Sequence, residues 1–223
     1  MSPLRIVGKA VQQHVDIIAI CDHNTAENVY ATVKCAPPQL KVFPGMEITS
    51  IDEVHILALF ENIDEVMALQ NIVYQHLLPE KNDELIFGEQ LIVNENDEIE
   101  GHNDRFLIGY TSLTLSQIIS SIHEFKGIAI ASHVDREQFG IINQLGFIPE
   151  DLKFDGLEIS YRITKSQAVM RYPQICQYPL ITSSDAHHLD HIGRSTIDLL
   201  IEKPDIHEFK WALQRIKGRK VIF

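Results

Sequence analysis

Six side chains of the kinds that bind transition metals stand at the ends or beginnings of apolar runs in distant parts of the sequence. They are His23, Glu47, His55, His133, Asp185 and His187. Strands from distant parts of a chain converge when they close into a barrel, and functional groups gather at one rim of that barrel. Imidazole and carboxylate ligands suit Zn, Mn or Fe ions rather than Ca²⁺. The pattern predicts a metal-dependent hydrolase, in which a bound ion would lower the pKa of a water molecule.

The segments around His133 and Asp185 give the sharpest signals. His133 follows the apolar run Ile128–Ser132, whose small residues leave room beside an imidazole. Asp185 and His187 are two positions apart, so on a strand they would face the same side and reach one ion. The alternative for this segment is a turn in which Asp185 serves as a cap.

The other ligand positions are weaker when each is taken alone. Glu47 lies just inside an apolar run, where a carboxylate is costly to bury unless it is paired or bound to metal. His55 lies in the apolar segment 54–60 and could instead be a hydrogen-bonded core residue. Asp22 and His23 precede an expected helix, so a capping aspartate and a surface histidine are the alternative for that pair.

Three further residues are candidates for catalysis. Arg136 and Arg162 could hold substrate oxygens, although each could equally be a surface ion-pair partner. Asp22 could act beside the metal ligands. Cys21 has no local base, and we expect it to be a buried thiol rather than a nucleophile.

The elements that must position these residues alternate between strands and helices, which predicts parallel β/α units and an α/β barrel. We expect strands at 16–20, 41–43, 54–60, 127–132, 154–160, 180–183 and 196–200, with Pro44-Gly45 ending the second. We expect helices at 3–14, 63–78, 113–125, 139–145, 166–175 and 205–217, and one more after Asn24. Residues 61–112 interrupt the alternation and are interpreted as an insertion in a single domain spanning 1–223.

Composition limits the class of protein. The net charge is −12, so binding of nucleic acid by charge alone is disfavoured, although a metal-dependent nuclease remains compatible. The three cysteines are widely spaced and odd in number, which favours a reducing, cytoplasmic setting over a disulfide framework. The sequence contains no apolar run long enough for a membrane span and no signal-peptide pattern at its start.

Taken together, the motifs resemble the PHP (polymerase and histidinol phosphatase) superfamily of metal-dependent phosphoesterases. The matching segments run in the family's order, and they are Ile20–Asn24, Pro44–Thr49, Val54–Ala58, Ala131–Arg136, Leu157–Ser160 and Ser183–Gly193. The resemblance covers essentially the whole chain outside 61–112. It implies a distorted (β/α)7 TIM-like barrel with two or three divalent transition metal ions, Zn, Mn or Fe. The ligands it implies are the six named above, with Asp22 beside them.

The resemblance implies hydrolysis of a phosphate mono- or diester in a small phosphorylated substrate, a nucleotide or a nucleic-acid end. Similar metal barrels also hydrolyse amides, so that chemistry stays open. The family begins with a strand carrying a His-x-His pair, whereas this chain starts at Met1-Ser2-Pro3. We therefore expect a barrel without its first strand, with fewer metal ions and little or no activity. The alternative function is a catalytically impaired barrel that binds a ligand or partner.

Overall fold

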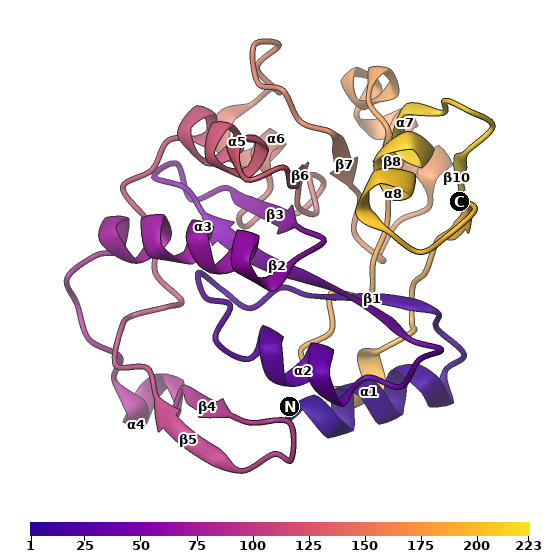
Figure 1. The fold of residues 1–223 in the computed structure, drawn as a ribbon. Coiled ribbons are helices and arrows are strands. Elements are labelled where there is room, and N and C mark those ends of the chain that lie inside the picture. The colour runs from indigo at the N-terminus through magenta and orange to yellow at the C-terminus, as the bar shows by residue number, and fades with distance from the viewer.

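The computed structural model describes residues 1–223, and its centre is a curled sheet of six strands (Figure 1). The strands lie in the order β1-β2-β3-β6-β7-β8. Their bounds are β1 Ile17–Ile20, β2 Lys41–Thr49, β3 His55–Leu59, β6 Ile128–Ala131, β7 Gly156–Glu158 and β8 Leu180–Ile181. β1 and β8 form the two edges and do not pair with each other, so the sheet is open.

The prediction of a (β/α)7 barrel is confirmed only as an α/β fold with a curled sheet. The main sheet has six strands, and β3 runs antiparallel to both β2 and β6, while the other neighbours pair in parallel. The connection from β2 to β3 covers only residues 50–54, and a parallel return needs a crossover of a dozen or more residues. Because β3 is reversed, its first residue, His55, lies at the rim where the other strands end.

The predicted strand at 196–200 lies outside the main sheet. β9, Asp198–Leu200, pairs with a strand that the sequence did not suggest, β10, Lys220–Ile222. The predicted end of the second strand at Pro44-Gly45 is also wrong, because β2 continues to Thr49. The ladder with β3 begins at Gly45, and the Pro44 carbonyl accepts from the Phe60 N–H just beyond β3. Proline therefore costs no interior ladder bond here.

The helices follow the predicted ranges closely. They are α1 Pro3–Gln12, α2 Val29–Cys35, α3 Ile63–His76, α5 Leu115–Glu124, α6 Ile141–Leu145, α7 Lys165–Arg171 and α8 Ile206–Gln214. The predicted helix at 166–175 divides into α7 and a 3₁₀ segment, Pro173–Gln177, since proline cannot donate the bond that would continue α7. No helix is long and apolar enough to cross a membrane.

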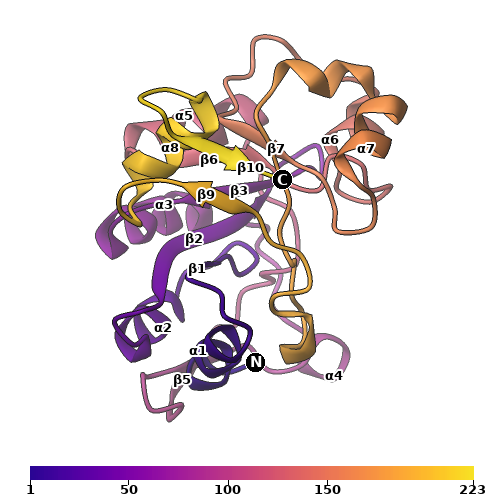
Figure 2. The ribbon, with the colours of Figure 1, turned by 90° about the vertical axis from the view of Figure 1, so that its right-hand side faces the viewer.

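Side chains that alternate along the strands fill two cores on opposite faces of the sheet. On β2, Val42 and Met46 belong to the larger core, whereas Phe43 belongs to the smaller one. The smaller core is completed by Ile206, Phe209 and Leu213 of α8. In both Figure 1 and Figure 2, α8 lies in the upper half of the molecule and α1 lies at the bottom. Glu47 lies four residues after Phe43 and so shares its face of β2.

Residues 77–112 leave the main sheet and carry a short helix, α4 Glu84–Phe87, and a hairpin of β4 Leu91–Val93 and β5 Ile99–His102. In Figure 1, α4, β4 and β5 lie below and to the left of α2. Its attachment to α2 is polar, because the Asn28 amide donates to the Leu91 carbonyl at 3.0 Å and Lys34 pairs with Glu95 at 2.5 Å. By contrast, Val66, Leu69 and Val73 of α3, within the predicted insertion, belong to the larger core.

Candidate metal centre

Three predicted ligands meet at the rim where β1 and β2 end and β3 begins. Oε2 of Glu47 lies 3.3 Å from Nδ1 of His23 and 3.2 Å from Nδ1 of His55. One donor atom from each of these residues lies within 4.8 Å of the others. The Glu47 and His55 side chains are buried, whereas His23 is 33% exposed. This triad could hold a metal ion that solvent reaches from the His23 side.

The local backbone explains why the triad forms. His23 pairs with Glu47 as a parallel bridge just beyond β1, and the Glu47 N–H donates to the Asp22 carbonyl at 3.1 Å. His55 is held from its other side, because the ring of Phe139 stacks on it with centroids 4.3 Å apart. The His55 N–H also donates to the Phe139 carbonyl at 3.0 Å. Phe139 gave no signal in the sequence, since a stacking aromatic outside a strand has no recognisable pattern.

His133 extends the cluster from the end of β6. Its Nε2 lies 3.6 Å from Oε1 of Glu47, and its ring centroid lies 5.4 Å from that of His55. Its backbone N–H donates to the buried carboxylate of Glu158, on the neighbouring strand β7, at 3.1 Å. The structure therefore places His133 beside Glu47 and His55, as the sequence predicted.

Asp185 and His187 lie near the cluster, but the strand argument for them is wrong. β8 ends at Ile181, and Asp185 has a left-handed backbone with φ of 43°. The Asp185 carboxylate forms an ion pair with Arg136. Nδ1 of the exposed His187 lies 3.6 Å from Oδ1 of Asp185, and its ring centroid lies 6.3 Å from that of His23. Both residues thus stand at the outer side of the cluster.

The remaining predicted residues do not join the cluster directly. The Asp22 side chain is exposed and forms no hydrogen bond or ion pair, although its backbone carbonyl holds Glu47. Arg162 is also exposed, and its guanidinium lies 5.7 Å from the Tyr161 ring. Arg136, which was expected to hold substrate oxygens or to form an ion pair, forms the pair with Asp185.

Two residues near the cluster were missed as candidates for the site. Glu158 ends β7, is buried, and accepts from the His133 N–H and the Ser183 hydroxyl. A carboxylate closing an apolar run is the signal that singled out Glu47, and it applied equally to Glu158. Arg194 donates to the carbonyls of Ser184 and Asp185 at 2.7 and 2.9 Å, and so fixes the turn at Asp185. Its position in an irregular loop gave no sequence signal.

Burial and mutual contacts shift the pKa values of Glu47 and His23 in the cluster. Burial raises the pKa of the Glu47 carboxyl, but the imidazoles of His133, His55 and His23 outweigh burial, and the net pKa lies well below its usual range. Burial lowers the pKa of His23 more than Glu47 raises it. Burial also raises the pKa of the Cys21 thiol, and nearby carboxylates raise it further. Cys21 is therefore a protonated thiol, as the sequence suggested, and not a nucleophile.

The donor set fits a transition metal ion. Nδ1 of His133 is buried without a hydrogen-bond partner, and Nδ1 of His23 and of His55 lie 3.3 and 3.2 Å from Glu47 Oε2 without the geometry of a hydrogen bond. A buried polar atom without a well-formed hydrogen bond costs free energy, and a metal ion between these donors would remove that cost. Imidazole nitrogens and a carboxylate are the ligands that Zn, Mn and Fe ions take.

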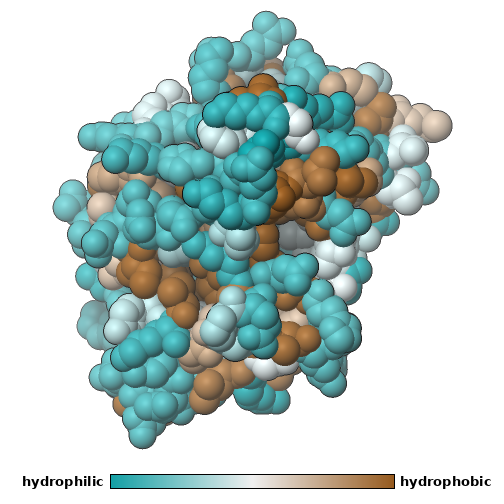
Figure 3. Space-filling view, turned by 45° about the vertical axis from the view of Figure 1, so that its right-hand side comes forward, coloured by the Kyte–Doolittle hydropathy of each residue, from teal (hydrophilic) through white to brown (hydrophobic).

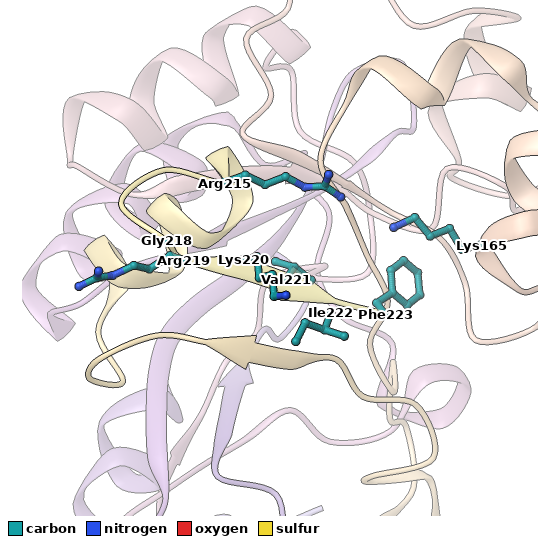
Figure 4. A pocket seen from close by; sticks show the side chains of 8 residues that line it. All are labelled: Lys165, Arg215, Gly218, Arg219, Lys220, Val221, Ile222 and Phe223. Carbon is teal, nitrogen blue, oxygen red and sulfur yellow. The ribbon is translucent and has the colours of Figure 1, made fainter.

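The cavity drawn in Figure 4 lies elsewhere. Its walls are β10 and the residues around it, with Lys165 and Arg215 pointing toward each other across the opening. No predicted site residue lines it. The surface view in Figure 3 shows hydrophobic residues around the middle of that face, with hydrophilic residues covering its upper part. The candidate metal ligands lie at the rim of the main sheet, where Glu47, His55 and His133 are buried.

Comparison with known proteins supports the fold. The chain is 27% identical over 106 residues, 45% of its length, to the uncharacterised protein YqxK of Bacillus subtilis, and spans 27% of that protein. It superposes on endonuclease Q of Pyrococcus furiosus with a TM-score of 0.75 and 16% identity, covering 99% of this chain and 53% of that one. Endonuclease Q bound to a 27-mer duplex with an abasic lesion gives a TM-score of 0.71, with the same identity and coverage.

A candidate metal-dependent phosphoesterase from Bifidobacterium adolescentis matches with a TM-score of 0.54 and 17% identity, over 92% of this chain and 84% of that one. No family model matches the sequence. The chain spans about half the length of endonuclease Q and a smaller part of YqxK. The predicted resemblance to metal-dependent phosphoesterases is therefore borne out as a similarity of fold, along nearly the whole chain.

Proposed function

We propose that this protein hydrolyses a phosphate ester at the metal centre. The observation that carries the proposal is the cluster of three imidazoles, of His23, His55 and His133, around the buried Glu47 carboxylate. His23, Glu47 and His55 would hold the first ion, and His133, Asp185 and His187 would supply ligands for a further one. A divalent transition metal ion, when bound, supplies Lewis acidity toward a phosphoryl oxygen and makes a water molecule more acidic.

The chain's own residues would bind and orient the ester. Arg136 is the candidate for the substrate phosphate, because a guanidinium binds two phosphate oxygens at once. Arg136 forms an ion pair with Asp185, which holds its guanidinium in place. Its buried Nε has no hydrogen-bond partner, so it could donate to a phosphate oxygen. Arg162 is exposed and could bind a more distant substrate oxygen. The free carboxylate of Asp22, next to His23, is placed to accept a hydrogen bond from the attacking water.

The substrate class follows from the fold relatives only as a proposal. Endonuclease Q was crystallised with a duplex substrate that carries an abasic lesion, which favours a phosphodiester in nucleic acid. The net charge of −12 argues against broad electrostatic binding of a duplex, so a lesion, an end or a mononucleotide is the preferred target. Cytoplasmic location would fit such a substrate.

The test is hydrolysis with added Mn²⁺ or Zn²⁺ by wild type, His55→Asn and the matched control His14→Asn. His14 lies on the surface with φ of 55°, a backbone that asparagine tolerates. The substrates are bis(p-nitrophenyl) phosphate, p-nitrophenyl phosphate, a mononucleotide and a duplex with an abasic site. We expect His55→Asn to lower turnover about 100-fold or more and His14→Asn to leave it unchanged. Equal turnover in the two variants would refute the proposal.

The open sheet favours one second candidate, a barrel that binds a ligand or partner without turnover. β1 and β8 do not pair, so no strand lies between the His23 side and the Asp185 side of the cluster. Binding of Mn²⁺ or Zn²⁺ by the wild-type protein, without hydrolysis of any of the four substrates, would support this candidate instead.

A further inference from the structure

We infer that Asn24 is a positioning residue for the metal centre, joining the His23 loop to the end of β2 and to residues 107–113. The inference rests on the proposed metal centre and deepens it. It predicts that part of the 77–112 excursion is coupled to metal binding although it contributes no ligand.

The contacts of Asn24 reach two other segments of the chain. Its side-chain amide donates to the carbonyls of Leu107 at 2.9 Å and Gly109 at 2.7 Å. Its Oδ1 accepts from the Thr49 N–H at 3.0 Å, and its own N–H donates to the Glu47 carbonyl at 2.8 Å. Asn24 is completely buried, so water cannot replace these bonds. One side chain thus fixes the backbone next to two candidate ligands, His23 and Glu47.

The backbone of Asn24 also needs a particular residue type. Its φ of 52° lies in the left-handed region, which asparagine, aspartate and glycine enter more readily than other residues. Asparagine alone among these offers two N–H donors for the carbonyls of Leu107 and Gly109. Aspartate would face both carbonyls with oxygens. The backbone and the contacts therefore select the same residue.

Residues 107–113 are fastened along the same end of β2 by further bonds. The Thr111 N–H and hydroxyl both donate to the Thr49 carbonyl, at 2.9 and 2.8 Å. The Ile51 N–H donates to the Leu113 carbonyl at 2.8 Å. Loss of the Asn24 side chain would leave buried carbonyls and the Thr49 N–H without partners, which loosens this junction. The positions of His23 and Glu47 depend on that junction.

The experiment compares Asn24→Gly with Asn28→Gly. Glycine keeps the left-handed backbone at position 24 without strain, so Asn24→Gly removes only the side chain. Asn28 is the matched control, because its side chain donates to the Leu91 carbonyl and accepts from the Val93 N–H, both at 3.0 Å, but makes no hydrogen bond to β2 or to residues 21–24. Both variants remove two bonds to the 77–112 excursion.

The readouts are Mn²⁺ affinity by calorimetry and amide hydrogen exchange of residues 22–24 and 107–113. We expect Asn24→Gly to weaken Mn²⁺ binding about 10- to 100-fold, while Asn28→Gly changes it about twofold or less. We also expect faster exchange in both segments of Asn24→Gly only. Equal losses of affinity in the two variants, or none in either, would overturn the inference.

Failure of the proposed function gives a different result. If wild type takes up no Mn²⁺ or Zn²⁺, the metal centre itself is refuted, whichever variant is used. Exchange then still decides whether Asn24 joins the two segments. Exchange in 22–24 and 107–113 that is unchanged in Asn24→Gly would overturn that part as well.

Discussion

Gly45 is the first residue of the β2–β3 ladder and lies against the end of β1, so replacing it with alanine should separate the strands that carry the ligands. A Cβ at this position would lie 2.7 Å from Cys21 Sγ, 2.9 Å from the Ile20 carbonyl oxygen and 3.0 Å from the Ala58 carbonyl oxygen. Two of these neighbours are backbone atoms of adjacent strands and cannot move alone. Overpacking of this kind costs about 1–3 kcal/mol of unfolding free energy.

For a chain of this size, that loss corresponds to a fall in Tm of about 2–12 °C. Gly8→Ala is the control, because a Cβ on Gly8 of α1 meets nothing within 4 Å. Alanine in a helix should raise stability there by about 0.5–1 kcal/mol. The assay is urea unfolding of both variants, together with the Mn²⁺-dependent shift in Tm, which reports the His23–Glu47 geometry.

The double variant Cys21→Ala/Gly45→Ala tests the cause. Removing Sγ relieves the shortest contact but leaves the two carbonyl contacts, so we expect partial recovery relative to the sum of the single variants. The reasoning is wrong if Gly45→Ala unfolds at the same urea concentration as wild type. It is also wrong if the double variant shows simple additivity.

Three further predictions follow from other contacts. A metal ion at 100 times its Kd should stabilise the fold by about 2.7 kcal/mol, which is about 5–11 °C in Tm, and His55→Asn should abolish that shift in a thermal melt. Arg136→Met removes the guanidinium partner of the Asp185 carboxylate and should cost about 1.5–3 kcal/mol in urea unfolding, with recovery in Arg136→Met/Asp185→Asn. Burial raises the pKa of Asp155, but His123, the Ala129 N–H and Lys210 outweigh it and lower the net pKa. This carboxylate therefore stabilises the fold above its unfolded pKa of about 3.9, and the stability is lost as pH falls through the folded pKa. The difference in unfolding free energy between wild type and Asp155→Asn should shrink in acid.

The sequence predicted the helices well, because their apolar spacing and caps are local features. Thr114, for instance, opens α5 through a capping box with Gln117. Strand direction was harder, since no local signal shows that β3 turns back after Thr49. The pattern of ligands at strand ends nevertheless held for His55, because reversal of β3 brings its first residue to the shared rim. Periodicity failed at Asp185, where the chain had already left β8 for a turn.

Of the ten non-glycine residues with positive φ, three follow strands that end at the rim of the candidate ligands. Asn24, His133 and Asp185 each follow a strand of the main sheet within a few residues, and their φ angles are 52°, 29° and 43°. Such conformations cost about 1–3 kcal/mol each in non-glycine residues and persist only where the surroundings impose them. Here the surroundings are the Asn24 amide bonds, the Glu158 acceptor for the His133 N–H, and the Arg194 donors to the Asp185 carbonyl. Each of these three residues is thus held by hydrogen bonds, which do not contribute to the packing of the two hydrophobic cores. The positive-φ backbone and the imidazole nitrogens without well-formed hydrogen bonds both cost free energy at this rim. A bound metal ion would offset the cost of the nitrogens.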